Sequence, residues 1–313
     1  MVKLKRILSS LIIFAVIFAF GLNCDRISEE ISDYLNKTPE LVINPDNGFK
    51  KEFKYMYIED SDDYIPENKE DLLEIFYSVL NNGWKEFTFY CPADYVDCLT
   101  DIRVMSQDEV LLANLNNFVS SYNSYATIKT VFDTAGEVTI KVDYNYTDLE
   151  IKIIDEMIDK IITENINDSM TDEEKIKALH DYVINNSVYD KQKAENDTSE
   201  YDSARMNGLL FDGYGICTAY ADVMEVFLTK LNIPNYKISS SNHVWNAVYI
   251  NGKWLHLDAT WDDPTTSDGS NILSHDFFLV DNTVIVKDDK EELKEHSFDL
   301  KVYQEFDETK KAQ

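Results

Sequence analysis

The dipeptide Asn251-Gly252 constrains the fold of this chain more tightly than any other feature of its sequence. It separates two β-rich runs, 243–250 and 253–258. Asn-Gly between such runs is the strongest short-range signal for a two-residue β-hairpin, because both loop positions need a positive φ. The hairpin fixes the register, so that Ile250 pairs with Lys253 and each step outward adds one facing pair.

This register brings a histidine and an aspartate together. Counted outward from the turn, Asp258 faces Trp245, and His243 lies two positions further along the strand of Trp245. Alternate residues of a strand share a face, and diagonal neighbours across two strands lie within side-chain reach. The sequence therefore predicts that the carboxylate of Asp258 can hydrogen-bond the imidazole of His243.

A cysteine precedes this hairpin at the start of a predicted helix. Gly213-Tyr214-Gly215-Ile216-Cys217 runs into a segment with apolar residues at helical spacing, which are Tyr220, Val223, Met224, Phe227, Leu228 and Leu231. At a helix N-terminus the unpaired N–H groups and the dipole favour a thiolate and can stabilise an oxyanion. A lone cysteine is more often an inert core residue. The His–Asp pair downstream favours a nucleophile, with His243 as its base and Asp258 orienting the imidazole.

Other residues offer weaker alternatives. His256 shares a face with Asp258 and ranks second as the base, since its carboxylate would lie two residues away on the same strand. A Cys-His-His-Asp metal cluster lacks any tight ligand pair, so we expect no metal and no cofactor. One tryptophan is expected to line the cleft, and Asp262-Asp263-Pro264 is expected to form a turn. His180, His275 and His296 are interpreted as surface or structural residues.

Three blocks carry a family resemblance. They are 215–221 (GICTAYA), 243–246 (HVWN) and 254–264 (WLHLDATWDDP). In this order and spacing the chain resembles the bacterial transglutaminase-like superfamily over about residues 172–280. The resemblance implies a papain-like α+β core, with a helix carrying the cysteine packed on an antiparallel sheet. It also implies a catalytic triad of Cys217, His243 and Asp258.

Two features depart from the family pattern. Ala219 stands where the family usually has glycine, and its added bulk could narrow the acyl site. The aromatic residue that supports the oxyanion in the family has no firm counterpart, and Tyr201 and Asn207 are candidates. Members include amide-forming transglutaminases and proteins that look like cysteine peptidases, so the resemblance leaves hydrolysis and acyl transfer open.

The part of the chain before this core reads as a separate small α+β domain. Periodicity predicts helices over 70–80 and about 107–122, a strand over 87–90 and a hairpin of 127–132 with 138–144. Thr171 and Glu174 form a capping-box signature for a later helix, and the charged stretch 191–201 is expected to be a surface loop. Cys91 and Cys98 are equally compatible with a disulfide and with two free thiols. We expect domains at 27–148 and 149–313.

The first 26 residues have the layout of an export signal or membrane anchor. Lys3, Lys5 and Arg6 precede an apolar run from Ile7 to Leu22, and Cys24 follows where a bacterial lipoprotein carries its lipidated cysteine. An uncleaved anchor fits equally well. The domain is therefore expected outside the cytoplasm, secreted or held at the membrane through this segment alone.

The charge balance excludes one class of partner. The chain has 58 Asp and Glu against 29 Lys and Arg, a formal net charge of −29. A nucleic-acid binder needs a basic face to displace counterions from phosphates, so nucleic acid is not expected. The sequence favours a thiol enzyme that acts on peptide or protein amides, of which cell-wall peptides are one source, with hydrolysis preferred to transfer to amines. A non-catalytic peptide- or glycan-binding module on the same fold is the opposing hypothesis.

Overall fold

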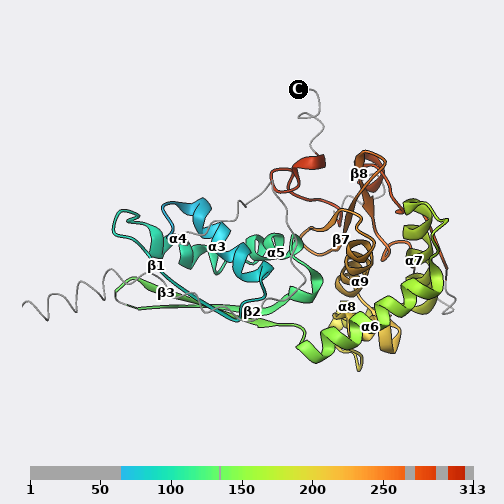
Figure 1. The fold of residues 1–313 in the computed structure, drawn as a ribbon, viewed down its shortest axis with the longest axis horizontal. Coiled ribbons are helices and arrows are strands. Elements are labelled where there is room, and N and C mark those ends of the chain that lie inside the picture. Colours follow the sequence, from blue (N-terminus) through green and yellow to red (C-terminus); the bar gives the residue numbers. More distant parts are fainter. Residues whose placement is uncertain (1–64, 134, 265–271, 287–294, 307–313) are drawn as a thin grey trace, which may run out of the picture.

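A computed structural model describes residues 65–133, 135–264, 272–286 and 295–306. The basic and apolar N-terminal segment, Cys24 and the tether predicted after it lie outside the described residues. Within the described ranges, no helix combines the length and the apolar character needed to cross a membrane. Helices, two antiparallel three-stranded sheets and one short parallel pair of strands make up the described fold, which is α+β (Figure 1).

The N-terminal part is a sheet in the order β1-β3-β2 with helices on one face (Figure 1). The strands are β1 (Glu86–Tyr90), β2 (Tyr125–Phe132) and β3 (Glu137–Tyr144), and the helices are α3 (Lys69–Asn81), α4 (Cys98–Met105) and α5 (Glu109–Asn117). Alternate residues of β3 are buried under the helices, which is the period expected of a sheet with one face covered.

The strands and the helix over 70–80 are confirmed, whereas α4 was not predicted. The helix expected to reach residue 122 ends at Asn117, and the chain continues into a 3₁₀ turn, Ser121–Asn123, capped by the hydroxyl of Ser120. Cys91 and Cys98 form a disulfide, which ties the end of β1 to the start of α4.

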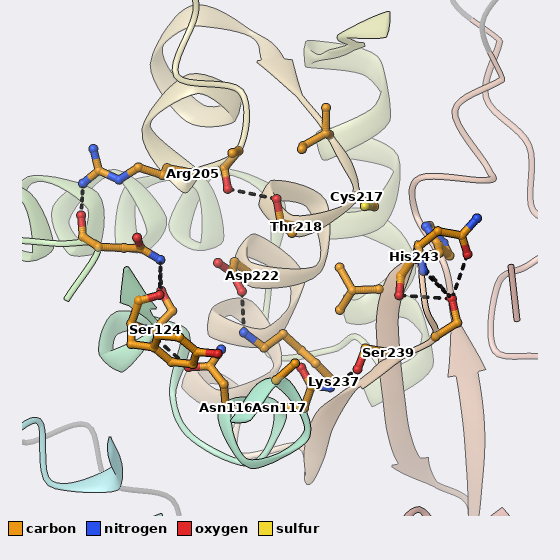
Figure 2. Close-up of a pocket in the computed structure, with 18 of the residues that line it drawn as sticks. Asn116, Asn117, Ser124, Arg205, Cys217, Thr218, Asp222, Lys237, Ser239 and His243 are labelled. Atoms are coloured by element: carbon orange, nitrogen blue, oxygen red, sulfur yellow. Dashed lines mark hydrogen bonds and ion pairs between the residues drawn. The ribbon is translucent and has the colours of Figure 1, made fainter. Parts of the chain in front are cut away.

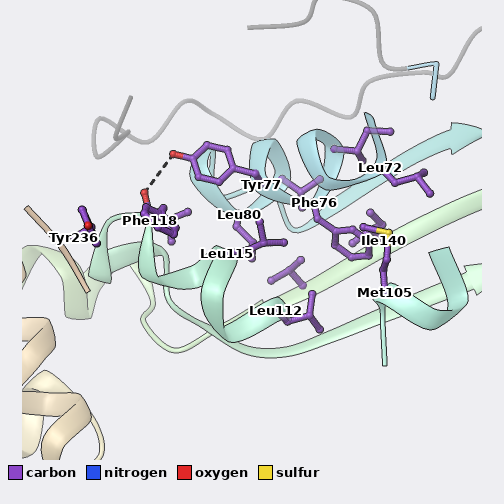
Figure 3. Close-up of a cluster of buried hydrophobic side chains, with 14 of the residues drawn as sticks. Leu72, Phe76, Tyr77, Leu80, Met105, Leu112, Leu115, Phe118, Ile140 and Tyr236 are labelled. Atoms are coloured by element: carbon purple, nitrogen blue, oxygen red, sulfur yellow. Dashed lines mark hydrogen bonds between the residues drawn. The ribbon is translucent and has the colours of Figure 1, made fainter. Parts of the chain in front are cut away.

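One hydrophobic cluster joins the N-terminal part to the rest of the molecule. Leu72, Phe76 and Leu80 of α3 pack against Leu112 and Leu115 of α5 (Figure 3). The cluster continues through Phe118 to Tyr236, whose ring lies 5.0 Å from that of Phe118. The N-terminal helices therefore share their core with the second sheet. The division into domains at 148/149 stays a prediction.

The C-terminal part packs helix α9 (Cys217–Lys230) against a sheet in the order β6-β7-β8. The strands are β6 (Asn235–Ser239), β7 (Val244–Ile250) and β8 (Lys253–Leu257). The predicted register is confirmed, since Ile250 pairs with Lys253. Asn251 and Gly252 have φ values of 53° and 80°, as the two-residue turn requires.

Two long helices flank α9. They are α6 (Asp148–Asn165) and α7 (Asp172–Asn186), and each begins with a capping box, made by Thr147 with Glu150 and by Thr171 with Glu174. The second of these boxes was predicted. Their buried faces meet α9 in a second hydrophobic cluster beneath the site described below.

Short elements lead into α9. Strand β4 (Val188–Tyr189) pairs in parallel with β5 (Tyr214–Gly215), and between them lie α8 (Lys191–Asn196) and the π-helical turn Gly208–Asp212. The loop predicted over 191–201 is thus wrong at its start, because the Asp190 carboxylate accepts from the Lys193 N–H and caps α8. The remaining short elements are α10 (Asn282–Ile285) and the 3₁₀ turn Gln304–Phe306.

Candidate active site

Cys217 is the first residue of α9, as the sequence predicted. Its approach needs a glycine, because a Cβ on Gly215 would lie 2.5 Å from Leu209 Cδ1 and 3.0 Å from the Tyr220 ring. Of the cysteines in the described residues Cys217 alone is free, and it is half-buried.

The backbone around Cys217 leaves donors open. Ile216, just before the helix, is extended, and its N–H donates to Ser203 O. Within the described part of the chain the N–H groups of Cys217 and Thr218 have no acceptor. They are the unpaired donors of a helix N-terminus, beside a thiol that water can reach.

His243 and Asp258 are paired as the hairpin register predicted. His243 Nε2–H donates to Asp258 Oδ2 at 2.6 Å, and the two residues are 8% and 1% exposed. The other carboxylate oxygen, Oδ1, accepts the N–H groups of Thr260 and Trp261 at 3.0 and 3.1 Å. The backbone of its own turn thus fixes the Asp258 carboxylate, and this carboxylate fixes the His243 ring.

Neighbouring charge and burial shift the pKa of His243 in opposite directions. Burial lowers the pKa of the imidazole, but Asp258 and a hydrogen bond with Cys217 outweigh it and raise the pKa to about 10. Burial likewise raises the pKa of Asp258, whereas His243 and His296 bring it well below its usual range. Because Asp258 takes Nε2, Nδ1 is the ring nitrogen left for Cys217, which lies beside His243 in Figure 2. This is the order of contacts that proton transfer between thiol and imidazole needs.

A second histidine binds the same aspartate. His296 Nε2–H donates to Asp258 Oδ2 at 2.9 Å, and His296 is fully buried. Its ring lies edge-on to Trp261 and Trp245, with centroids 4.6 and 5.0 Å away. Sequence reasoning placed His296 on the surface or in a structural role. No pattern in the sequence could have brought it to Asp258, because it lies outside any helix or strand.

His256, the second-ranked base, belongs to the core under the site. Its Nδ1 accepts from Trp245 Nε1 at 3.0 Å, and its ring stacks on Phe306. Burial, and then His296, lower the pKa of His256 to about 3, so the ring is neutral near pH 7. Neither feature suits a general base for Cys217.

The remaining predicted positions fall around the site. Tyr201 stacks on Tyr214 at 4.0 Å, and Asn207 Nδ2 donates to Glu150 at 3.4 Å; neither lines the pocket. No tryptophan is among the described residues that line it, which corrects the expectation of a tryptophan wall. Trp245 of β7 and Trp261 of the turn after β8 instead lie against the His243 ring, with centroids 5.7 and 6.4 Å away.

The turn predicted at Asp262-Asp263-Pro264 is present, and both of its carboxylates are engaged. Backbone bonds from Asp262 to Asp258 and from Asp263 to Thr260 close it. Asp263 accepts from the Tyr220 hydroxyl at 2.5 Å, and burial raises the pKa of Asp263 to about 6 against that hydrogen bond.

A pocket of about 580 Å³ opens in front of Cys217 and His243 (Figure 2). Its far wall comes from the N-terminal part, through α5 and the start of β2. The residues that line it are Ala113, Asn116, Asn117, Ser124, Tyr125, Asn145, Asp202, Ala204, Arg205, Ile216, Cys217, Thr218, Asp222, Lys237, Ser239, Ser240, Ser241, Asn242, His243 and Val244. Ten of these twenty residues carry hydroxyl or amide side chains.

The charged residues of the pocket are paired. Lys237 Nζ donates to Asp222 Oδ1 at 2.5 Å, and Arg205 is bound by Asp202 and Glu150 at 2.8 Å each. The charges that a substrate meets in the pocket are therefore largely neutralised, although the chain as a whole is strongly acidic.

The site's elements lie within a stretch that matches known proteins. Residues 160–259 match the model of the Transglutaminase-like superfamily. The kyphoscoliosis peptidases of Mus musculus and Homo sapiens are 20% and 21% identical over 151 residues, which cover 42% of this chain and 22% of each relative. This chain therefore spans about a fifth of the length of those relatives. A crystal structure described as a TGase covers 44% of this chain and 44% of its own, with 18% identity and a TM-score of 0.33.

Proposed function

Because residues 160–259 belong to the transglutaminase-like superfamily, we propose that this chain is a thiol enzyme that cleaves peptide or protein amide bonds through Cys217, His243 and Asp258. One observation carries the proposal: His243 bridges the half-buried Cys217 thiol and the buried Asp258 carboxylate. A structural histidine in the core has no need of a solvent-accessible thiol on its second nitrogen.

The geometry suits a two-step reaction. The Cys217 sulfur adds to the amide carbonyl carbon, and the oxyanion that forms lies near the open N–H groups of Cys217 and Thr218. His243 gives its Nδ1 proton to the leaving amine as the C–N bond breaks, which leaves a thioester. Water then adds to the thioester and gives a proton to His243, and the carbonyl reforms as the thiolate leaves. Asp258 keeps the ring oriented through Nε2 in both steps.

Hydrolysis is the branch we propose over transfer to an amine. A transferase must keep water from the thioester. The pocket in front of Cys217 presents serine, asparagine and threonine side chains, which bind water well. Such a lining supports water as the acceptor.

The proposed substrate is a peptide or protein segment outside the cytoplasm, with cell-wall peptides as one source. The export-like segment before Cys24 supports this location, and the same segment is the proposed anchor to the membrane. The net charge of −29 supports substrates of cationic or neutral character over nucleic acid.

The test is an incubation of the full chain, in detergent, with cell-wall peptides and a tagged primary amine, analysed by mass spectrometry. New peptide termini in the wild type, absent in Cys217→Ala, are the expected result. Transfer of the tag without new termini would replace hydrolysis by acyl transfer. Identical products from wild type and Cys217→Ala would contradict any enzyme function at this site.

A further inference from the structure

A second cluster of histidine and carboxylate groups lies away from the pocket. His180 and Asp181 lie on α7, and His275 lies in the segment 272–286. Asp181 Oδ1 is 3.1 Å from His180 Nδ1 and 2.7 Å from His275 Nε2, and the three atoms all lie within 4.8 Å of one another. His180 is fully buried, whereas the side chains of Asp181 and His275 are 25% and 36% exposed. The cluster is thus open to solvent on one side.

The outer contacts of the cluster cannot all be hydrogen bonds at once. His275 Nε2 lies 2.7 Å from Asp181 Oδ1 and 2.5 Å from Lys177 Nζ. A ring nitrogen that donates to the carboxylate has no lone pair for the ammonium, and one that accepts from the ammonium has no proton for the carboxylate. Lys177 Nζ also lies 2.8 Å from Asp181 Oδ2. The ammonium therefore occupies the position of a cation shared by an imidazole and a carboxylate.

The inner side fixes the orientation of His180. Its Nε2 lies 3.1 Å from Asp262 Oδ2, and both side chains are fully buried. Because a carboxylate only accepts, Nε2 carries a proton, and in the neutral ring Nδ1 then presents a lone pair to Asp181 Oδ1. Two acceptors that face each other at 3.1 Å call for a proton or a cation between them. Asp262 is itself held, since Oδ1 accepts the Phe277 N–H at 2.9 Å.

We propose that His180 Nδ1, Asp181 Oδ1 and His275 Nε2 bind one Zn²⁺ ion, with the fourth position open to water. Ligands at 2.0–2.1 Å in a tetrahedron lie about 3.3 Å apart. The separation of 3.1 Å between His180 Nδ1 and Asp181 Oδ1 is close to this value, and that of 2.7 Å between Asp181 Oδ1 and His275 Nε2 is shorter. Two imidazoles and one carboxylate favour zinc over calcium or magnesium, which take oxygen ligands. Asp262 supplies the carboxylate behind a ligating histidine that such sites use to fix the tautomer.

The ion would join two separate parts of the chain. His180 and Asp181 come from α7, and His275 comes from the stretch that follows the turn of Asp258 and Asp262. Asp262 also bonds the backbone of that turn, because its N–H donates to Asp258 O at 3.2 Å. Zinc here pins the turn that carries the catalytic carboxylate, and it takes no part in the reaction.

The proposal is tested on the full chain with Cys217→Ala, so that the active-site thiol cannot bind metal. Zn²⁺ binding is followed by calorimetry, and Co²⁺ serves as a spectroscopic probe of the coordination number. We expect one ion per chain and a higher unfolding temperature with Zn²⁺ than with Mg²⁺. Asp262→Asn lowers affinity roughly 10-fold or more, as loss of such outer partners does at other sites, and His275→Ala lowers it further. Lys177→Met tightens binding, because the competing ammonium is gone.

The cluster of His243, Asp258 and His296 provides the control. His296→Ala leaves Zn²⁺ affinity unchanged if the ion binds where we propose. Zn²⁺ binding that is lost in His296→Ala and kept in His275→Ala would overturn the proposal. Weaker binding in Lys177→Met would do so as well, since a structural ion pair, and no cation site, would then explain the contacts. His275 and Lys177 are partly exposed, so neither substitution empties the core.

Discussion

The two histidine–aspartate clusters of this molecule are built alike and differ in what faces their outer nitrogen. One turn supplies both carboxylates, Asp258 and Asp262. Each uses Oδ1 to accept backbone N–H groups and Oδ2 to hold the Nε2 of a buried histidine, His243 or His180. The Nδ1 of His243 is left for the thiol of Cys217, whereas that of His180 faces a carboxylate.

This difference decides the chemistry that each cluster supports. A thiol can give up a proton to the outer nitrogen, so the first cluster is suited to nucleophilic catalysis. A carboxylate has only lone pairs to offer, and a second imidazole can add one from a ring nitrogen, so the second cluster is suited to a cation. The two clusters thus share a carboxylate–imidazole pair, and the third group that contacts the imidazole determines what each cluster can do.

The largest effect is expected where the thiol and its imidazole are separated. His243→Gln removes the group that exchanges a proton with Cys217, and kcat should fall roughly 10⁴-fold or more, as for other triads. His180→Gln, its counterpart in the second cluster, should leave kcat within about threefold, because it touches no reacting atom. Steady-state kinetics on one peptide substrate measure both. Equal losses in the two variants would mean that the clusters do not differ as described.

Substitution of the two aspartates should affect different properties, which are kcat for Asp258 and zinc affinity for Asp262. Asp258→Asn can present its amide to His243 Nε2 and so mis-set the ring, and we expect kcat to fall roughly 10²- to 10⁴-fold. Asp262→Asn should change kcat far less and act on zinc affinity instead. Kinetics and Zn²⁺ titrations on the same two preparations provide the comparison. A fall in kcat for Asp262→Asn as large as that for Asp258→Asn would show that the turn responds as one unit.

The pH dependence of kcat/KM follows from the pKa of His243, which burial and the neighbouring Asp258 shift in opposite directions. Burial lowers the pKa of the ring and Asp258 with Cys217 raises it to about 10, so the imidazolium persists above neutral pH. We expect kcat/KM to fall about tenfold per pH unit only above roughly pH 10. In Asp258→Asn the alkaline limb should move to lower pH, because the carboxylate that raises the pKa is gone. If the alkaline limb of Asp258→Asn stayed at the wild-type pH, a group other than His243 would be responsible for it.

The same shift predicts how stability depends on pH. The folded pKa of His243 lies above its unfolded value, so its contribution is complete below about pH 6.5 and is lost as the pH rises toward 10. The pKa of Asp258 lies below its unfolded value, so its contribution is present above about pH 4 and is lost on acidification. The difference in unfolding temperature between wild type and His243→Gln should therefore shrink from pH 6 to pH 10.

His296 should have an intermediate effect, because it acts through Asp258. It shares Oδ2 with His243 and touches no substrate. His296→Phe should lower kcat roughly tenfold with little change in KM, and should shift the alkaline limb, since Asp258 then has one imidazole partner in place of two. His296→Gln can keep a hydrogen bond to Asp258 and should recover part of kcat. A change in KM alone would contradict this positioning role.

The sequence predicted the parts of this molecule that depend on neighbours along the chain. The turn at Asn251-Gly252 set the strand register, and from it the His243–Asp258 contact could be counted. The position of Cys217 followed from a glycine-rich entry and a helical apolar period. These features are local, so one sequence carries them.

What the sequence did not predict depends on contacts between distant segments. His296 reaches Asp258 from 38 residues away, with no periodic element to place it. Of the proposed zinc ligands, Asp181 and His275 are likewise separated by 94 residues in the chain, so no ligand spacing revealed them. The tether and Cys24 lie outside the described residues and stay predictions.

The wall that the N-terminal part gives to the pocket is also non-local, and it leads to the smallest effect that we expect. Asn116 lies on α5 and lines the pocket opposite Cys217. Asn116→Ala removes one neutral hydrogen bond to a bound peptide, worth about 1 kcal/mol, so KM should rise roughly fivefold with kcat nearly unchanged. Asn82→Ala, at the C-terminal cap of α3 and outside the pocket lining, is the control and should leave both constants unchanged. A fall in kcat for Asn116→Ala, with KM constant, would mean that this wall acts on the Cys217–His243 pair, and its role in substrate binding would have to be abandoned.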